Sequence, residues 1–230
     1  MKLPDKSTAL EEAVARIPDG ATVMVGGFGV PGTPFALLHE LRRQGRKDLT
    51  LIKNDANEAG MGIDHLLTGG QVRRLISTHI GLNPNAVALM NAGTLEVEFC
   101  AQGILAERIR AGGAGLRAIV TDIGADTDLA EGKARLEMEG QRLLVETALR
   151  ADVALIHAAA ADSFGNLAYL ATARNFNVAM AMAADTVIAE AETLGPPGCL
   201  APDAVHTPGV FVDHVVELSE LSREYGVVRR

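Results

Sequence analysis

The sequence predicts an α/β fold, a single domain with a mostly parallel sheet flanked by helices. Of its 230 residues, 48% are hydrophobic but only 3% are aromatic, so the core must consist of Ala, Val, Leu, Ile and Met. Parallel sheets covered by helices on both faces have such cores. In addition, short apolar runs alternate with amphipathic stretches along most of the chain, which is the βαβ pattern of a parallel sheet.

Short apolar runs bounded by turn residues predict the strands. The first run follows the turn Asp19-Gly20, and the run 95–99 alternates apolar and polar side chains, as a strand with one wet face would. The expected strands are 21–25, 49–53, 72–77, 95–99, 152–157, 185–190 and 210–216.

Apolar side chains at helical spacing predict the helices. Ser7 is the expected N-cap of the first helix and Thr33 that of the second, with Pro34 in its first turn. The expected helices are 7–16, 34–44, 84–91, 103–111 and 175–184. The segment 121–141 lacks a long apolar stretch and predicts an irregular loop and hairpin, with a small subdomain as the alternative. The whole domain is expected to span 1–230.

The most informative stretch is 23–41, where an apolar strand meets four glycines and then a helix. Glycines let backbone N–H groups approach an anion, and a helix N-terminus adds partial positive charge, so this order predicts an anion site. The spacing Gly27-x-Gly29-x-x-Gly32 also fits the dinucleotide-binding fingerprint, and Asp55 lies near the position of its ribose-binding acid. A tight turn without a ligand remains the alternative.

Polar side chains follow two predicted strands at their carboxyl ends, where α/β sheets carry their sites. The segment 54–58 (NDANE) could orient a polar substrate or stabilise an oxyanion, or it could form an ordinary Asx turn. Gln102 could donate to a ligand carbonyl or cap the helix that follows. Cys100 has no base near it in the sequence and is interpreted as a buried small residue rather than a nucleophile.

The net charge of −8 argues against nucleic acid and anionic membranes as partners. Arg42, Arg43, Arg46 and Lys47 do cluster, but at a helix end, where cations interact favourably with the macrodipole. No apolar run reaches transmembrane length, and the mixed charges of 1–17 do not fit a signal peptide. These features predict a soluble protein.

Cysteine and histidine usage predicts neither disulfides nor a metal site. The two cysteines lie far apart without a CxxC pattern, which is typical of a reducing, cytoplasmic setting. The six histidines are scattered without HxH or HExxH spacing.

Several segments carry a resemblance to a known family, and they occur in that family's order from one end of the chain to the other. They are DGATVMVGGFGVPGTP at 19–34, QGILAERIRAGGAG at 102–115, DSFGNL at 162–167, ARNFN at 173–177 and HTPGVFVD at 206–213. Together they resemble the A (alpha) subunit of family I CoA-transferases, the 3-oxoacid/acetate CoA-transferase group. This match is far more specific than the glycine spacing alone.

The resemblance implies the open CoA-transferase type of fold and places coenzyme A, a substrate rather than a tightly bound cofactor, at the glycine loop. The implied CoA-binding residues are Val25, Gly26, Gly27, Phe28, Gly29, Val30 and Pro31. Asn54 matches the family's oxyanion-side asparagine, and Gln102 its substrate-contacting glutamine. Ala101 replaces the usual proline before Gln102, and Lys53 and Asp55 differ from some relatives, which affects the acyl-group preference more than the reaction class.

The resemblance also implies a reaction that this chain cannot complete alone. In the family, a glutamate carboxylate attacks an acyl-CoA thioester in ping-pong catalysis. That glutamate lies in a Ser-Glu-Asn-Gly type motif on the beta half, and nothing similar occurs here. The expected partner is therefore a separate beta subunit, in an α2β2 assembly acting on an acyl-CoA and a small carboxylic acid. The alternatives are a nicotinamide-dependent oxidoreductase and a non-catalytic binding subunit of the same fold.

Overall fold

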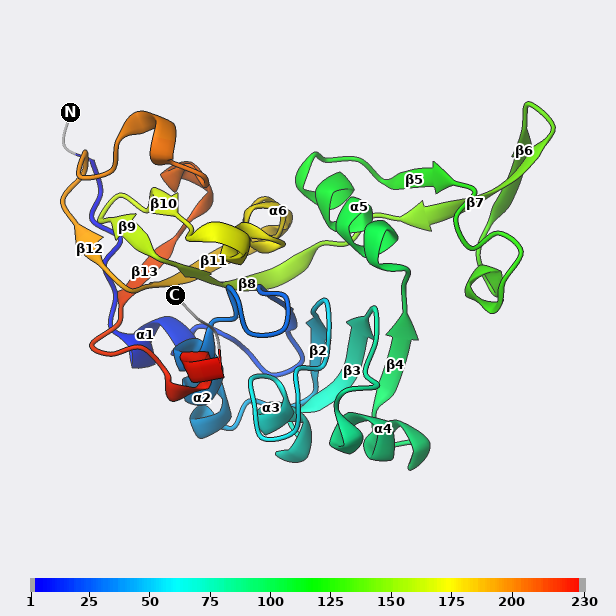
Figure 1. Cartoon of the computed structure of the whole chain (residues 1–230), viewed down its shortest axis with the longest axis horizontal. Coiled ribbons are helices and arrows are strands. Elements are labelled where there is room, and N and C mark those ends of the chain that lie inside the picture. The colour runs from blue at the N-terminus through cyan, green and yellow to red at the C-terminus, as the bar shows by residue number, and fades with distance from the viewer. Residues whose placement is uncertain (1–2, 228–230) are drawn as a thin grey trace.

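The computed structural model describes residues 3–227, so 1–2 and 228–230 of the expected domain lie outside it. Its centre is a seven-stranded sheet in which every neighbouring pair is parallel, as the sequence predicted (Figure 1). In spatial order, its strands are β13 (His214–Glu217), β11 (Ala184–Ala191), β8 (Ala151–Ala158), β1 (Thr22–Val25), β2 (Leu49–Ile52), β3 (Val72–Ser77) and β4 (Glu96–Phe99).

Helices cover both faces of this sheet (Figure 1). On one face lie α1 (Leu10–Ala15), α2 (Phe35–Gln44), α3 (Asp64–Thr68) and α4 (Pro84–Asn91), and on the other lie α5 (Gln102–Gly113) and α6 (Asn177–Ala183). Within the described residues, every helix is too short or too polar to cross a membrane.

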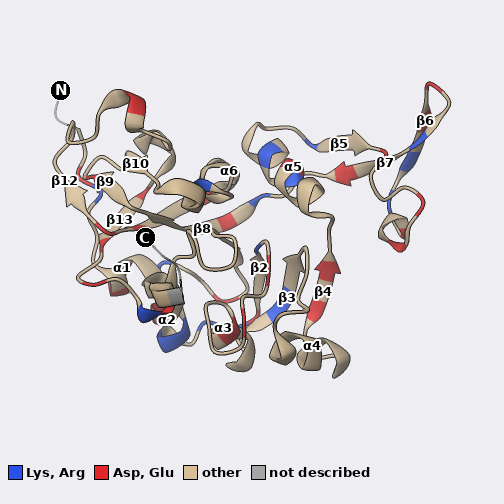
Figure 2. Cartoon of the chain, in the orientation of Figure 1, with Lys and Arg blue, Asp and Glu red and all other residues tan. Residues whose placement is uncertain are grey.

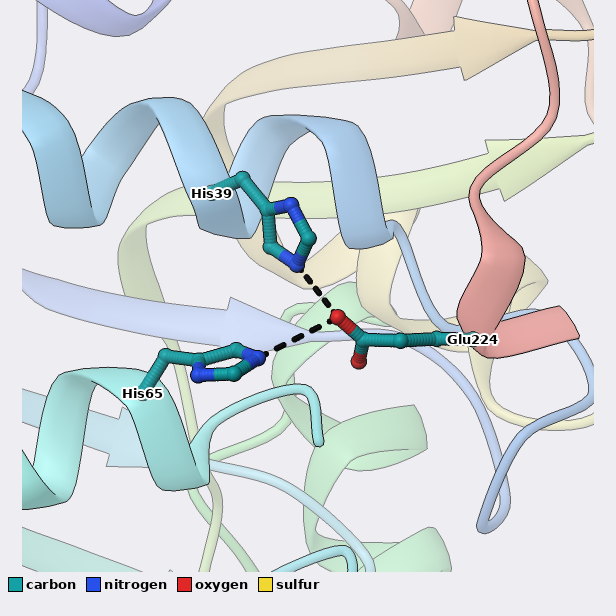
Figure 3. A group of neighbouring side chains, drawn as sticks. All are labelled: His39, His65 and Glu224. Carbon is teal, nitrogen blue, oxygen red and sulfur yellow. Dashed lines mark hydrogen bonds and ion pairs between the residues drawn. The ribbon is translucent and has the colours of Figure 1, made fainter. Parts of the chain in front are cut away.

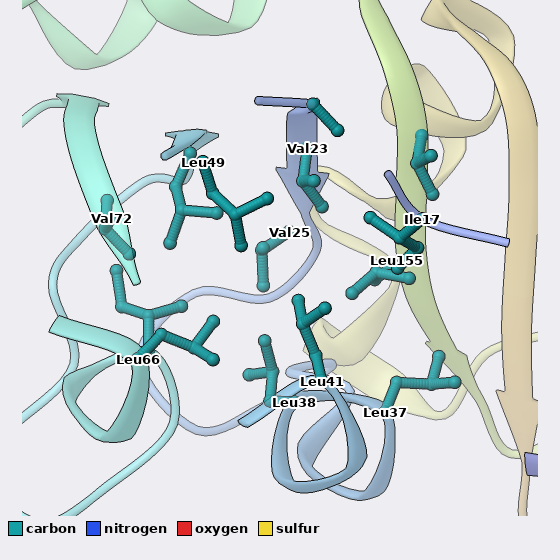
Figure 4. Packing of buried hydrophobic residues seen from close by; sticks show 14 of the residues in the cluster. Ile17, Val23, Val25, Leu37, Leu38, Leu41, Leu49, Leu66, Val72 and Leu155 are labelled. Carbon is teal, nitrogen blue, oxygen red and sulfur yellow. The ribbon is translucent and has the colours of Figure 1, made fainter. Parts of the chain in front are cut away.

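The two faces carry two separate hydrophobic cores because side chains alternate along each strand. In β1, Val23 and Val25 pack toward α2, while Met24 between them belongs to the core beneath α5 and α6. Figure 4 shows the first core, where Leu38 and Leu41 of α2 meet the central strands. Since both faces are covered, the central strands are continuous apolar runs, as expected of a buried parallel sheet.

Two smaller sheets complete the fold. One joins β5 (Ala118–Thr121), β7 (Gln141–Thr147) and β6 (Arg135–Met138) in antiparallel order and projects from the body between α5 and β8 (Figure 1). The predicted hairpin is therefore real, but it extends beyond 121–141 at both ends. The other sheet joins β10 (Leu167–Ala168), β9 (Ala160–Asp162) and β12 (Leu194–Gly195).

Both predicted N-caps are wrong. Helix α1 begins three residues after Ser7, whose hydroxyl instead donates to the Asp5 carboxylate at 2.6 Å. Helix α2 begins after Pro34, and the Thr33 hydroxyl donates back to the Gly29 carbonyl at 2.7 Å. In each case the hydroxyl side chain closes its own turn before the helix, a competing use of such residues.

The last predicted strand, 210–216, is also shorter than expected. The chain makes a 3₁₀ turn over Gly209–Phe211 before β13 begins at His214. A further 3₁₀ turn, η5 (Arg223–Val227), lies against α2, in a segment whose sequence suggests only a polar tail (Figure 1).

Candidate functional site

The predicted site residues gather at the carboxyl edge of the central sheet. Strands β2, β3 and β4 extend the sheet on one side of β1, and β8, β11 and β13 extend it on the other. The direction of winding therefore reverses at β1, and ligands of open α/β sheets bind in the crevice at such a point. The glycine loop follows β1, the segment 54–58 follows β2, and Gln102 follows β4.

The glycine loop is held by two side chains that follow β2. The Asp55 carboxylate accepts the Gly29 N–H at 2.8 Å, and the Asn57 amide donates to the Gly29 carbonyl at 2.8 Å. Gly27 and Gly32 have φ of 99° and 78°, in the region that favours glycine. The loop thus has a defined shape, in which the Gly29 N–H already binds an anion of the protein itself.

Asp55 remains a carboxylate although it is buried. Burial alone would raise the pKa of Asp55, but the Lys53 ammonium and the N–H donors of Gly29, Asn54 and Asn57 hold that pKa below its usual value. Lys53 is fully buried, with its Nζ 3.4 Å from Asp55 Oδ1. An Asp55 carboxylate engaged in this way is poorly placed to bind a ribose, which weakens the dinucleotide alternative.

The start of α2 is likewise already occupied by a protein anion. The Leu37 N–H donates to Glu190 Oε2 at 2.9 Å, and the other oxygen of this buried carboxylate lies 2.9 Å from His157 Nδ1. The positive end of the helix therefore stabilises Glu190. The sequence prediction of an external anion at this helix start is wrong, because Glu190 comes from β11, 153 positions away.

The two amide residues expected in the site lie in direct contact. Gln102 Nε2 donates to Asn54 Oδ1 at 2.9 Å, and Asn54 Nδ2 donates to Asp55 Oδ2 at 3.0 Å. Asn54 is buried, whereas Gln102 is exposed at the first residue of α5. The side chain of Gln102 therefore does not cap its helix; it extends the polar chain from Asp55 through Asn54 to the surface.

A pocket of about 160 Å³ opens beside the glycine loop. Its walls come from the loop, from the segment after β2 and from the segment after β3, and most of them are apolar. The lining residues are Phe28, Gly29, Val30, Asp55, Ala56, Asn57, Glu58, Met61, His79, Ile80 and Leu82. Phe28 and Leu82 are 47% and 68% exposed, so two large apolar side chains at this pocket contact water.

The predicted loop residues thus separate into two groups. Phe28, Gly29 and Val30 line the pocket. Val25 is buried in the core, and Gly26 donates its N–H to the Leu155 carbonyl at 2.9 Å. The Pro31 carbonyl accepts the Asn175 amide at 2.9 Å, and Gly27 packs against Thr33, where an added Cβ would lie 2.1 Å from the hydroxyl oxygen.

Other sequence interpretations concern residues outside the pocket. Cys100 is buried, as expected, and burial raises the pKa of its thiol, which disfavours the thiolate. The basic cluster follows α2 (Figure 2), where Arg43 pairs with Glu40 at 2.6 Å and Arg46 donates to the Ala15 carbonyl at 3.1 Å. These cations contact their own surface, in agreement with the structural interpretation.

Sequence reasoning missed two groups of residues. Lys53 stood out only as a departure from relatives, although a lysine after four buried strand residues is a signal for a buried charge pair. His39, His65 and Glu224 lie together in space (Figure 3), yet their sequence positions gave no hint of it.

Comparisons with known proteins agree with this architecture. Residues 7–218 match the family described as Coenzyme A transferase. The alpha chain of a probable coenzyme A transferase from Bacillus subtilis (strain 168) is 49% identical, over 92% of this chain and 93% of its own length. The corresponding chain of a succinyl-CoA:3-ketoacid coenzyme A transferase from Xanthomonas campestris pv. campestris (strain B100) is 48% identical, over 92% and 86%.

A solved structure with a different named activity is also similar. A variant of the decarboxylase AibA/AibB superposes with a TM-score of 0.80 and 34% sequence identity, over 94% of this chain and 84% of the other. The family match covers nearly all of the described residues. The chain therefore belongs to the coenzyme A transferase family, as the motifs at 19–34 and 102–115 predicted.

Proposed function

We propose that this chain is the alpha subunit of a heteromeric CoA-transferase, which moves CoA from a small acyl- or 3-oxoacyl-CoA to a free carboxylic acid. The observation that carries the proposal is the contact between Asn54 and Gln102 beside the pocket. It places two amides with N–H donors at the sheet edge, and tetrahedral oxyanions of acyl transfer need such donors. The family relationship supplies the reaction class.

In the proposed reaction, a glutamate of a beta subunit is the nucleophile. Its carboxylate oxygen attacks the thioester carbonyl, the C–S bond breaks, and an acyl anhydride and CoA thiolate form. The thiolate then attacks the glutamyl carbonyl, which releases the first acid and leaves a glutamyl-CoA thioester. A second acid reverses these steps. Coenzyme A is a substrate throughout, and no tightly bound cofactor is needed.

The exposed apolar side chains support a partner at this edge. Phe28 and Leu82 leave apolar surface in water beside the pocket, and such surface is typical of a site that a ligand or another protein covers. We propose that the acyl-CoA and the beta subunit cover it together, in an α2β2 assembly in the cytoplasm.

Gln102→Ala tests the proposal in the complex with the beta-type chain encoded nearby. Loss of one oxyanion donor should lower kcat/KM about 100-fold, while the complex still assembles on gel filtration. Gln141→Ala, which removes an exposed glutamine from β7, is the matched control and should leave turnover unchanged. Normal turnover of Gln102→Ala with every acid tried would contradict the proposed role.

The similarity to a decarboxylase favours a second candidate, decarboxylation of an acyl-CoA by the same fold. The two reactions are distinguished by their products. The complex and each chain alone are incubated with a panel of acyl-CoA donors and acids, and both the new CoA thioester and released CO2 are measured. Transfer only in the mixture supports the transferase, and CO2 release without transfer supports the decarboxylase.

A further inference from the structure

Three side chains from separate parts of the chain meet beside α2, away from the pocket described above. His39 lies on α2, His65 on α3 and Glu224 in the 3₁₀ turn η5 (Figure 3). One possible ligand atom from each lies within 4.8 Å of the other two. Three histidine and carboxylate ligands that converge in this way form the donor set of His₂Glu zinc sites.

Both imidazoles point at the same oxygen. Nε2 of His39 and Nε2 of His65 each contact Glu224 Oε1, the second at 3.2 Å. Ligand atoms on a tetrahedral Zn²⁺ with bonds of about 2.1 Å lie about 3.4 Å apart, so small side-chain rotations would admit the ion. The two rings meet edge to face, with centroids 5.1 Å apart and an interplanar angle of 82°.

The carboxylate is held in position from behind. Glu224 Oε2 accepts the Gly62 N–H at 2.7 Å, which orients Oε1 toward the imidazoles. Burial alone would raise the pKa of Glu224, but hydrogen bonds from His39, Gly62 and His65 hold that pKa below its usual value. The carboxylate is thus ionised at neutral pH, as a ligand must be, and a fixed outer partner is typical of metal ligands.

We propose that His39, His65 and Glu224 form a binding site for a divalent transition-metal ion, with Zn²⁺ as the best fit to two imidazoles and one carboxylate. The side chains of His39, His65 and Glu224 are 48%, 33% and 15% exposed, so water can supply the fourth ligand. The site is distinct from the pocket at the glycine loop, because none of the three residues lines that pocket.

The proposed ion would fasten the C-terminal turn to the body of the protein. Tyr225, the residue after Glu224, is buried against Phe35, with ring centroids 4.8 Å apart, and its hydroxyl donates to the Thr33 carbonyl. An ion bound by α2, α3 and η5 at once therefore stabilises the turn that supports the end of the glycine loop. Its role is structural and does not depend on the function proposed above.

Zinc titration of the full chain, without a histidine tag and after treatment with a chelator, tests the site. In competition with a chromophoric chelator, we expect one Zn²⁺ per chain. His65→Gln should weaken binding by about 100-fold or more, since it removes a ligand outright. His214→Gln is the matched control, because His214 is a partly exposed histidine outside the cluster, and it should bind Zn²⁺ as the wild type does.

Two further readouts separate the site from adventitious binding. Zn²⁺ should raise the Tm of the wild type and of His214→Gln but not of His65→Gln, because only a folded site gains from the ion. It should also slow amide hydrogen exchange in residues 223–227. Far-UV circular dichroism verifies that each variant is folded, and Glu224→Gln serves as a second ligand variant if His65→Gln is not.

The proposal is wrong if the wild type fails to compete for Zn²⁺, or if the ligand variants bind it as tightly as the control. The three side chains would then form only a hydrogen-bonded cluster. Binding that leaves both Tm and exchange of 223–227 unchanged would also overturn it, since an ion held elsewhere cannot fasten this turn.

Discussion

The glycine loop and the C-terminal turn η5 meet at Thr33, yet they are held in different ways. The glycine loop is fixed mainly by residues close in sequence, since Asp55 and Asn57 reach Gly29 across 26 and 28 positions. The turn is fixed by contacts across far longer separations, such as the 192 positions between Tyr225 and Thr33. Local contacts of the first kind leave a pattern in the sequence, and contacts of the second kind do not.

The difference extends to energetics. The loop is enclosed by backbone and buried polar groups, so a change there must disturb the body of the protein. The turn spans five residues and depends largely on Tyr225 and Glu224, so it can open by itself. Short segments with few buried contacts open at a lower free energy than the core. Changes in the loop should therefore lower global stability, and changes in the turn should act locally.

Gly27→Ala should have the largest effect. An added Cβ would lie 2.1 Å from the Thr33 hydroxyl oxygen and 2.6 Å from its backbone nitrogen, at a φ of 99° that side chains rarely adopt. Backbone strain and overpacking together should lower the free energy of unfolding by about 4 kcal/mol. Urea denaturation measures the change.

Gly29→Ala is the control in the same loop. Its φ is 58°, and an added Cβ would meet nothing within 4 Å, so about 1 kcal/mol should be lost. Equal losses at both positions would show that the loop is not enclosed in the way that the contacts of Gly27 indicate.

Asp55→Asn should have the next largest effect. The substitution leaves the buried Lys53 without its carboxylate and should cost about 3 kcal/mol near neutral pH. The folded-state pKa of Asp55 is lowered, so its stabilisation is fully present above the unfolded pKa of about 3.9 and is lost as pH falls through the folded pKa. The difference between variant and wild type should therefore shrink only below about pH 4. Urea midpoints across this range measure it, and a difference independent of pH would contradict the role of the charge.

The sequence predicted the parallel sheet and the place of the site because both depend on local patterns. Apolar runs and glycines located β1 and the loop, and the family motifs located Asn54 and Gln102, which the fold then brought together. The sequence could not predict that Glu190 would occupy the start of α2. A buried carboxylate on a distant strand has no local signal, and the same holds for the meeting of His39 with His65 and Glu224.

Cap assignments failed for a related reason. A Ser or Thr before a helix has two local uses, and the choice depends on the surrounding turn. Thr33 donates to Gly29 because the glycines bring that carbonyl within reach, a consequence of loop shape that composition alone does not reveal.

Tyr225→Ala should have the smallest effect on global stability, because the loss is confined to the C-terminal turn. Removal of a buried aromatic ring that packs against Phe35 and His157 should weaken docking of the turn by about 3 kcal/mol. Since the turn opens by itself, the urea midpoint should move much less than this figure suggests. Hydrogen exchange should accelerate in residues 223–227 and remain unchanged in β1 and β8. Tyr225→Phe keeps the ring and removes only the hydroxyl donor to Thr33, so it should lose about 1 kcal/mol of docking. Faster exchange throughout the central sheet in Tyr225→Ala would show that the turn and the glycine loop form one cooperative unit.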